Sequence, residues 1–225
     1  MVNSVSNGYE HVTASNNYLW SIRGPNAYIC ARPCTGTWVH DSRQLMQVDA
    51  SDDETWGVTT SQNIYKKSVD GKGSWMKIRG GLKHVTASGN GYIWGVNRND
   101  QIYKCKKPCT GQWKNVGGRL SQIDGGYAYV YGVNSGGAVY SRPIDGSGDW
   151  RCIPSVAMKH ITASGIDDIF ATSRSSEVYR CRKPCVGDWE KMSTNYRKLT
   201  QLDASFDAIF GVSVGGTVIR HKTGK

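Results

Sequence analysis

The side chains best suited to ligand binding lie in short polar segments that recur along the chain. The richest is 97–100 (Asn-Arg-Asn-Asp), and the pairs at 83–84 and 159–160 add Lys-His. Amide, carboxylate and basic groups are the hydrogen-bonding partners that sugar hydroxyls need. Tight hairpin turns need the same residue types, so a purely structural role stays open at each position. The candidate ligand-binding residues are His11, Lys83, His84, Asn97, Arg98, Asn99, Asp100, Asn134, Lys159 and His160.

The sequence contains no pattern typical of a catalytic or metal centre. Three of the five histidines occupy equivalent positions in a repeat, and none forms a His-x-x-x-His pair. Neither a Gly-x-Ser-x-Gly segment nor a phosphate-binding glycine loop is present. The acidic segment 52–54 (Asp-Asp-Glu) falls in a predicted surface turn. We therefore expect a binding protein without catalytic residues, cofactor or metal ion.

One short segment returns six times, 36 to 41 residues apart. It reads His-Val-Thr-Ala-Ser at 11–15 and Gln-Val-Asp-Ala-Ser at 47–51. Most copies continue with a segment such as 94–96 (Trp-Gly-Val) and an apolar-Tyr pair, and the first five end in a Trp. The copies begin near residues 11, 47, 84, 122, 160 and 201.

Four short strands are expected in each copy, because turn residues separate its apolar stretches. In the third copy they are predicted at 83–87, 92–96, 101–105 and 112–116. Four strands in about 40 residues, repeated four to eight times, is typical of a β-propeller. A solenoid would need polar capping repeats, which the terminal copies lack. We predict a single all-β domain over 1–225, a six-bladed β-propeller of four-stranded antiparallel blades in which residues 1–10 complete the last blade.

A second period of about 76 residues covers two copies. Odd copies begin His-apolar-Thr and carry Cys-x-x-Pro-Cys, whereas even copies begin Gln-apolar-Asp and two of them carry Asp-Gly-x-Gly at that place, at 70–73 and 145–148. This alternation predicts threefold pseudo-symmetry around the ring axis. The alternating Thr and Asp are expected to form a hydrogen-bonded layer near the central channel. The repeated Trp residues are expected to pack between blades, with stacking against a ligand as the alternative.

Six of the seven cysteines form three Cys-x-x-x-Cys pairs on alternate copies. A structural zinc ion takes four ligands, whereas each pair offers two thiolates and the pairs lie on separate blades. A tight turn containing proline can bring two cysteines four positions apart within bonding distance. We therefore expect disulfides, which favour an oxidising location, over metal ligands or free thiols. The expected disulfides are Cys30–Cys34, Cys105–Cys109 and Cys181–Cys185, and Cys152 is expected to be a buried thiol in an outer strand.

The composition is typical of a globular β-protein. The 225 residues are 38% hydrophobic and include 27 Gly, 8 Trp and 12 Tyr, which suits short strands joined by tight turns. No apolar run is long enough for a membrane helix, so we expect no membrane insertion, and the N-terminus lacks the pattern of a secretion signal. A net charge of +10 favours anionic partners. No nucleic-acid-binding motif is present, so no specific nucleic acid is expected.

Residues 94–105 (Trp-Gly-Val-Asn-Arg-Asn-Asp-Gln-Ile-Tyr-Lys-Cys) resemble the tectonin repeat. The alternation of Cys-x-x-Pro-Cys-x-Gly-x-Trp with 143–150 (Pro-Ile-Asp-Gly-Ser-Gly-Asp-Trp) is similar to the branch that contains the six-repeat, lipopolysaccharide-binding tachylectin of horseshoe crabs. The resemblance covers essentially the whole chain. It implies a six-bladed propeller and a lectin that recognises bacterial surfaces and agglutinates them. Other tectonin lectins bind methylated or N-acetylated sugars, so the resemblance does not fix the ligand.

This sequence departs from the repeat in several copies. The complete Trp-Gly-Val-Asn segment is present only in the third copy, and Asn is kept at its last position only by Asn97 and Asn134. If that position contacts ligand, the sites are unequal or fewer than six.

Three functions are compatible with these observations. The first is a multivalent lectin for microbial glycans such as lipopolysaccharide, with a defence role outside the cell or in a secretory granule, because repeated sites bind repetitive surfaces tightly. The second is a protein-interaction scaffold inside the cell, which the missing signal favours and the cysteine pairs oppose. The third is non-specific nucleic-acid binding through net charge. The sequence favours the lectin and leaves its oligomeric state open.

Overall fold

The strands follow one another blade by blade along the chain. Blade 1 contains β2 (His11–Ala14), β3 (Tyr18–Arg23), β4 (Asn26–Ala31) and β5 (Val39–Gln44), and blade 2 contains β6 (Gln47–Ala50), β7 (Glu54–Val58), β8 (Ile64–Ser68) and β9 (Met76–Ile78). Blade 3 contains β10 (His84–Thr86), β11 (Tyr92–Val96), β12 (Gln101–Lys106) and β13 (Lys114–Arg119), and blade 4 contains β14 (Gln122–Gly125), β15 (Tyr129–Val133), β16 (Val139–Pro143) and β17 (Arg151–Ile153). Blade 5 contains β18 (Met158–Thr162), β19 (Asp168–Ser173), β20 (Val178–Arg182) and β21 (Glu190–Lys191), and blade 6 contains β22 (Leu199–Ala204), β23 (Ala208–Ser213), β24 (Val218–Lys222) and β1 (Ser4–Val5).

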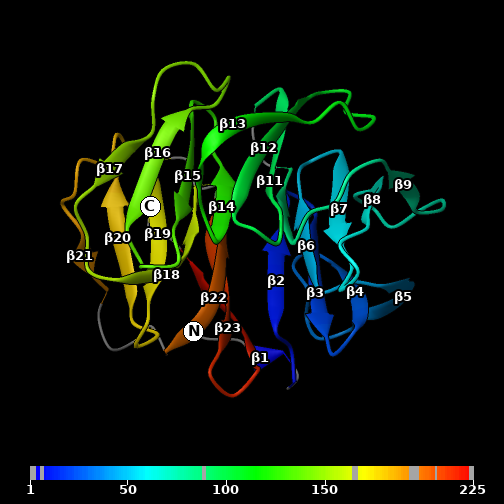
Figure 1. Ribbon diagram of the computed structural model, residues 1–225. Helices are drawn as coiled ribbons and strands as arrows, with labels where there is room; N and C mark the ends of the chain where they lie inside the picture. Colours follow the sequence, from blue (N-terminus) through cyan, green and yellow to red (C-terminus); the bar gives the residue numbers. More distant parts are fainter. Residues whose placement is uncertain are drawn as a thin grey trace.

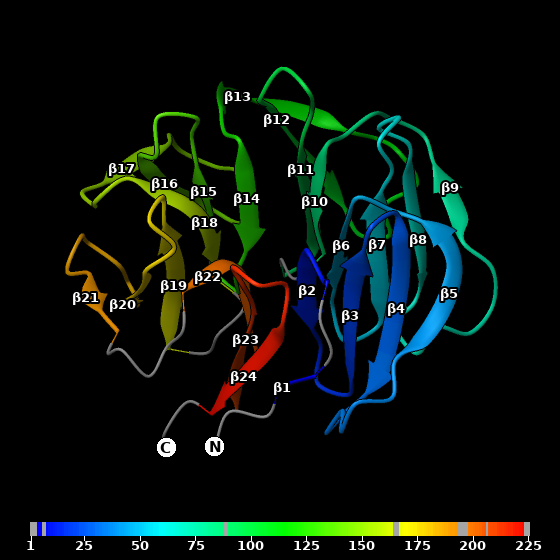
Figure 2. The same cartoon turned by 90° about the horizontal axis from the view of Figure 1, so that it is seen from below.

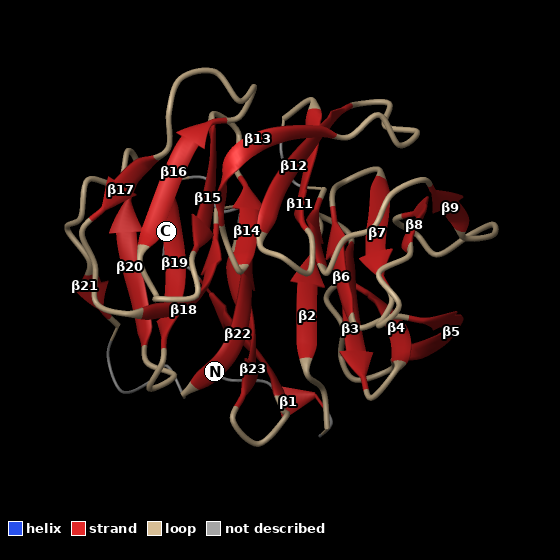
Figure 3. Ribbon diagram, viewed as in Figure 1, coloured by secondary structure: helices blue, strands red, loops and turns tan. Residues whose placement is uncertain are grey.

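The six sheets form a ring of blades. The computed structural model describes residues 4–5, 8–87, 90–163, 167–192, 198–205 and 207–222, and their regular elements are strands (Figures 1 and 3). The strands β2, β6, β10, β14, β18 and β22 lie toward the centre, and the outermost strands lie at the rim (Figure 2). The predicted six-bladed β-propeller is therefore confirmed. No helix among the described residues could cross a membrane.

The inner strands define two faces of the ring. Each inner strand begins at one face, which we call the histidine face because it carries His11, His84 and His160. Antiparallel pairing places the end of the second strand there too, since His84 pairs with Val96. Each inner strand ends at the opposite face, which we call the tyrosine face because Tyr127, which follows β14, is 80% exposed there. Loops from neighbouring blades therefore meet on each face.

One close contact explains the glycine of the Trp-Gly-Val segment. A Cβ atom on Gly95 would lie 2.4 Å from Leu82 Cδ1 and 2.8 Å from the His84 carbonyl oxygen. No side chain fits there, so the leucine that precedes the inner strand packs directly on the second strand. The same contact recurs at Gly57, Gly132 and Gly211.

The N-terminal strand closes the ring. Ser4 pairs with Ile219 and Val5 with Val218, which adds β1 to the edge of β24. The prediction that the start of the chain completes the sixth blade is confirmed for these two residues. Residues 1–3 and 6–7 of the predicted closing segment lie outside the described residues. The pairing removes an unpaired edge, which in other proteins promotes aggregation.

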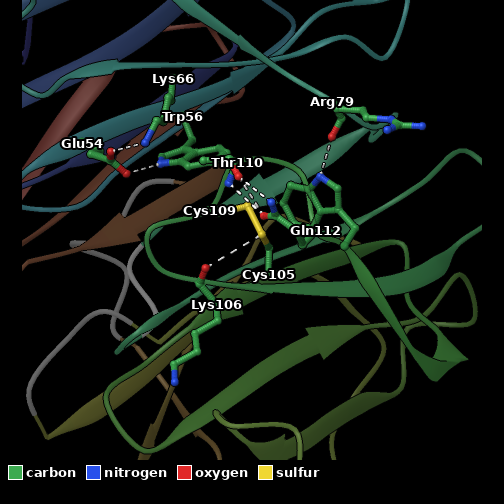
Figure 4. The surroundings of a disulfide bond; sticks show 10 residues. Glu54, Trp56, Lys66, Arg79, Cys105, Lys106, Cys109, Thr110 and Gln112 are labelled. Atoms are coloured by element: carbon green, nitrogen blue, oxygen red, sulfur yellow. Dashed lines mark hydrogen bonds and ion pairs between the residues drawn. A yellow bond between two sulfur atoms is a disulfide. The ribbon is translucent and has the colours of Figure 1, made fainter.

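Two kinds of seam join neighbouring blades. At the even-to-odd seams (blades 2/3, 4/5 and 6/1) a disulfide of the odd blade fills the interface, as Cys105–Cys109 does in one cluster with Trp56 (Figure 4). At the odd-to-even seams (blades 1/2, 3/4 and 5/6) the described core clusters contain no cysteine. Trp94 and Trp150 meet edge to face across the 3/4 seam with ring centroids 6.2 Å apart. The expected packing of the Trp residues between blades is confirmed.

The three predicted disulfides are present. Cys30–Cys34, Cys105–Cys109 and Cys181–Cys185 have Cα–Cα distances of 5.6, 5.6 and 5.5 Å. The prediction for Cys152 is wrong, because this free thiol is exposed. It lies in β17, the outermost strand of blade 4, which no further strand covers.

Candidate functional site

Three imidazoles surround the axis on the histidine face. The ring centroid of His160 lies 6.4 Å from those of His11 and His84. His11 Nε2 donates a hydrogen bond of 2.7 Å to the Val48 carbonyl, whereas neither ring nitrogen of His160 has a partner among the described residues. Burial lowers the pKa of all three imidazoles, that of His84 to about 3. The three rings are therefore neutral at neutral pH and do not attract an anion by charge.

Beside these rings, three glutamines tie blades together. Gln122 Nε2 donates to the Ile161 carbonyl at 2.9 Å, and its Oε1 accepts from the Ile161 N–H at 3.0 Å. The side-chain amide thus replaces a peptide group of a neighbouring strand. Gln47 makes the same two bonds with Val85, and Gln201 makes them with Val12. Each pair of bonds, which we call a glutamine clasp, crosses an even-to-odd seam.

Threonine and aspartate form the expected hydrogen-bonded layer further along the axis. Thr13 Oγ1 lies 3.1 Å from Asp49 Oδ1 and 2.9 Å from Asp203 Oδ2. One hydroxyl carries one proton, so both contacts are hydrogen bonds only when one carboxyl group is protonated. Burial and the neighbouring carboxylates raise the pKa of Asp49, and burial and Asp203 raise that of Asp124 to about 6. Among the described residues, no three His, Cys, Asp or Glu side chains are arranged to hold a metal ion.

The predicted polar loop at 97–100 closes its own turn. Asn97 Oδ1 accepts hydrogen bonds from the backbone N–H of Asn99 at 2.9 Å and of Gln101 at 3.0 Å. Asp100 adopts φ 63° at the last turn position, where blade 4 has a glycine, and its carboxylate pairs with Lys83. The structure therefore brings these predicted residues together. The amide oxygen of Asn97 is bonded within its own turn, and Asp100 and Lys83 form an ion pair with each other.

A cleft of about 190 Å³ opens at the 3/4 seam. Tyr140 and Trp150 of blade 4 line it, together with Asn134 from the predicted set and Arg119 of blade 3. Asn134 Oδ1 accepts from the Ala138 N–H at 2.9 Å, which orients the amide. Arg119 is exposed and donates to the Asn99 carbonyl at 2.9 Å, which links the cleft to the 97–100 loop.

The chemistry of the cleft suits a sugar ring. The aromatic rings of Tyr140 and Trp150 offer apolar faces, and such faces pack on the C–H face of a pyranose. The amide of Asn134 and the guanidinium of Arg119 offer donors for hydroxyls or phosphates. Trp150 Nε1 donates to the Gly117 carbonyl at 3.2 Å, so its ring is held in place across the seam.

Sequence reasoning found one of these four lining residues. The sequence predicts packing for Trp150, treats Tyr140 only as part of the repeated apolar-Tyr pair, and gives no role to Arg119. A signal for Arg119 exists in the sequence. A leucine precedes the inner strand in several copies, and the residue before that leucine is Gln44 in blade 1, Gly81 in blade 2 and the basic Arg119 in blade 3. Nine predicted residues do not line this cleft. Two of them, Arg98 and Lys159, are exposed on the histidine face. The other seven are His11, Lys83, His84, Asn97, Asn99, Asp100 and His160.

The propeller resembles solved structures of diverse proteins. The β-propeller domain of Cps50 (Swd1) from Myceliophteria thermophila is 8% identical with a TM-score of 0.69, and the alignment covers 100% of both chains. A streptogramin B lyase is 13% identical with a TM-score of 0.66, covering 100% of this chain and 88% of the lyase. Yeast RCC1 (Prp20), solved with Kap60, is 10% identical with a TM-score of 0.66, covering 95% of this chain and 70% of the other. At these identities the likeness concerns the fold alone.

Sequence comparison identifies a family. No curated protein sequence matches the chain. The family model described as the Tectonin domain matches residues 3–148, which is well over half of the chain and spans the first three blades and most of the fourth. The repeat, the alternating blades and the ring agree with that match. The chain therefore belongs to the tectonin domain family.

Proposed function

We propose that this protein is a lectin for microbial surface glycans, with lipopolysaccharide as the leading ligand, as in the horseshoe-crab tachylectin. The cleft at the 3/4 seam carries the proposal, because there the rings of Tyr140 and Trp150 meet the donors of Asn134 and Arg119. Lipopolysaccharide combines pyranose rings with phosphates. The net charge of +10 attracts those phosphates over a distance, and the cleft supplies the short-range contacts.

The equivalent positions of other blades support unequal sites. Where blades 3 and 4 have Asn97 and Asn134, hydroxyl residues accept the same turn bond: Thr59 from the Asn63 N–H at 3.1 Å, and Ser173 from the Glu177 N–H at 3.2 Å. A hydroxyl closes the turn, but it does not bring the two donor hydrogens of an amide. We therefore propose that the 3/4 seam is the principal site and that the other seams bind more weakly.

We propose that the protein acts without catalysis. The streptogramin B lyase of similar fold indicates that such a fold is compatible with an enzyme active site. The polar groups that line this cleft are an amide, a guanidinium and a phenol, and neither the amide nor the guanidinium exchanges a proton at neutral pH. A binding role fits them better than acid–base chemistry.

We also propose an extracellular or granule location and agglutination as the activity. Three disulfides favour an oxidising compartment. Agglutination follows where one molecule or oligomer binds two surfaces at once, because linked sites raise the effective concentration of each other.

The test is binding to immobilised lipopolysaccharide, with salt titrated in one series and free sugars in another. Arg119→Ala is expected to weaken binding about tenfold, because it removes charge-assisted hydrogen bonds. Lys77→Ala is the control, since this exposed lysine of β9 lies at the rim of blade 2 and its loss changes the net charge equally.

The outcome separates recognition from charge. Competition by a defined sugar at constant salt, together with a weaker Arg119→Ala variant and an unchanged Lys77→Ala variant, supports the lectin. Equal weakening of both variants, with no effect of any sugar, would show that the basic surface alone binds.

In that case a protein-interaction scaffold becomes the better proposal. The outer strands of blades 1 and 2 expose Val39 and Met76 by 60% and 59%, a feature that a protein partner could cover. Similar propellers include RCC1, whose structure contains Kap60.

A further inference from the structure

Two adjoining pockets open on the tyrosine face, away from the cleft. The axial pocket, of about 400 Å³, lies where the inner strands end, and its polar lining includes Asn16, Asp52, Asp53 and Lys107. The tyrosine pocket, of about 320 Å³, lies at the 4/5 seam. Both pockets include Gly126 and Tyr127, and the tyrosine pocket adds Ala128, Tyr129, Tyr131, Lys183 and Pro184.

Blade 4 departs from the other blades at this place. Where blades 1, 2 and 6 continue from the inner strand with Ala-Ser, blade 4 has Gly125-Gly126 followed by Tyr127. A Cβ atom on Gly126 would lie 3.0 Å from the Ala163 carbonyl oxygen and 3.1 Å from that of Tyr129. The chain therefore turns close against blade 5, and this turn carries the tyrosine out to the surface.

Two of the three tyrosines at this place are exposed to solvent. Tyr127 is 80% exposed and Tyr129 is 41% exposed, whereas Tyr131, in the same strand as Tyr129, is 3% exposed. The Tyr129 and Tyr131 rings lie side by side with centroids 6.3 Å apart. An exposed aromatic surface next to a pocket is typical of a binding site, because a ligand that covers it removes apolar area from water.

Basic residues of the disulfide turns reach the same two pockets. Lys183, from the Cys181–Cys185 turn, lines the tyrosine pocket and donates from Nζ to the Ala163 carbonyl at 2.8 Å. Lys107, from the equivalent turn of blade 3, lines the axial pocket. Each of these two turns therefore places a lysine side chain at one of the pockets.

The charges of the two pockets balance. Two carboxylates, Asp52 and Asp53, line the pockets together with two ammonium groups, Lys107 and Lys183. Asn16 Nδ2 donates to Asp52 Oδ2 at 2.7 Å, so an amide and a carboxylate stand side by side at the rim. A strongly anionic ligand gains little from such a surface. A neutral ligand with many hydroxyl groups can use both donors and acceptors.

We propose that Tyr127 and Tyr129 form the stacking platform of a second saccharide site, selective for a neutral pyranose, on the face opposite the cleft. The sugar lies against Tyr127 in the tyrosine pocket, and the next sugar of a longer glycan reaches Asn16 and Asp52 in the axial pocket. The inference rests on the proposed lectin function, but it uses no residue of the cleft.

A site on each face has a consequence for cross-linking. The cleft lies at the 3/4 seam, where Leu120 and Asn134 adjoin the histidine face, and the tyrosine pocket lies at the 4/5 seam on the tyrosine face. A single molecule then bridges two glycan surfaces without forming an oligomer.

The test is calorimetric titration of the whole protein with glucose, galactose, mannose, N-acetylglucosamine and N-acetylgalactosamine, at about 0.5 M NaCl to screen charge. Tyr127→Ala removes the platform, Tyr127→Phe retains the ring, and Arg119→Ala changes only the cleft. Because Tyr127 is mostly exposed, its replacement leaves the core intact. For at least one sugar, we expect Tyr127→Ala to weaken binding about tenfold, and Tyr127→Phe and the rim control Lys77→Ala to bind it as the natural protein does.

The variants distinguish the two proposals. If every sugar that binds the natural protein binds Tyr127→Ala equally well, the second site is rejected, and a loss in Arg119→Ala leaves the cleft standing. If Tyr127→Phe loses as much affinity as Tyr127→Ala, the hydroxyl and not the ring makes the contact, and the stacking platform is rejected. Failure of all five sugars to bind the natural protein rejects the second site, whereas the cleft is tested separately by binding to immobilised lipopolysaccharide.

Discussion

The seam between blades 2 and 3 and the seam between blades 3 and 4 are held by different means. At the 2/3 seam Gln47 clasps Val85, and Cys105–Cys109 packs against the neighbouring blade. At the 3/4 seam Trp94 donates from Nε1 to the Ile144 carbonyl at 3.1 Å, and its ring meets Trp150. The first seam has paired bonds to backbone groups and a disulfide of blade 3 that packs in the interface, whereas the second has indole-to-carbonyl bonds and packed aromatic rings.

The difference shows that two ways of joining blades alternate around the ring. The candidate cleft opens at a seam that has no glutamine clasp, where aromatic rings serve both packing and ligand contact. The clasped seams keep the ring closed, and three of them are spaced evenly around it. The tyrosine pocket, in contrast, opens at the 4/5 seam, which the Gln122 clasp also crosses, so both kinds of seam offer a candidate ligand site.

Removal of a glutamine clasp is expected to lower the free energy of unfolding more than the other substitutions below. Gln122→Ala leaves the N–H and carbonyl of Ile161 buried without partners, and this should lower the free energy of unfolding by about 3 kcal/mol. His84→Ala is the counterpart at an odd-to-even seam, where no described residue bonds its buried Nδ1. Urea unfolding measures both variants. Equal losses would contradict the distinction between the seams.

Loss of one disulfide should lower the free energy of unfolding less than loss of a glutamine clasp. The double substitution Cys105→Ser and Cys109→Ser is expected to lower the free energy of unfolding by about 2 kcal/mol, because the loop that it opens is short. Asp145→Ala tests the matching turn of blade 4, where Asp145 Oδ1 accepts from the Ser147 N–H at 2.9 Å, and about 1 kcal/mol is expected there. Cys152→Ser, at an exposed free thiol, should leave the unfolding midpoint unchanged.

The smallest effect is expected in the pH dependence of stability. Burial lowers the pKa of His84 to about 3, so between its ordinary value of 6.5 and about 3 the unfolded chain binds more protons, and stability falls as the pH falls. Burial raises the pKa of Asp124 from 3.8 to about 6, so between those values the folded chain binds more protons, and this opposes the loss. Unfolding midpoints between pH 7 and about 4 should therefore fall less steeply in His84→Gln and more steeply in Asp124→Asn than in the natural protein. The reverse order would reject this assignment of the protons.

Most of the fold was predictable because the same pattern of strands and turns recurs in six copies of the repeat. The second strand of blade 3 was placed at 92–96, where it is observed. The fourth strand was predicted at 112–116 and begins instead at Lys114. Trp113 leaves the sheet because its indole donates to the Arg79 carbonyl of blade 2 at 2.9 Å, an inter-blade bond that no local pattern reveals.

The site was less predictable, for reasons of geometry. Asn134 was found because its loop resembles 97–100, but Arg119 comes from the preceding copy. A comparison of copies aligns equivalent positions, whereas a cleft at a seam joins non-equivalent ones. Tyr127 is not in the predicted set, although Gly125-Gly126 interrupts the repeated Ala-Ser directly before it, and its exposure distinguishes it from the tyrosines that pack in the blades.

The position of the clasps bears on how such a ring could be assembled from pieces. The sequence repeat begins with an odd blade and ends with an even one, so within each repeat the two blades meet at an unclasped seam. The clasps join one repeat to the next, and the last of them, Gln201 to Val12, joins the end of the ring to its start. Three separate copies of one two-blade unit would therefore meet through the seams that carry the glutamine clasps. The arrangement is that of a trimer whose subunits have been linked into one chain.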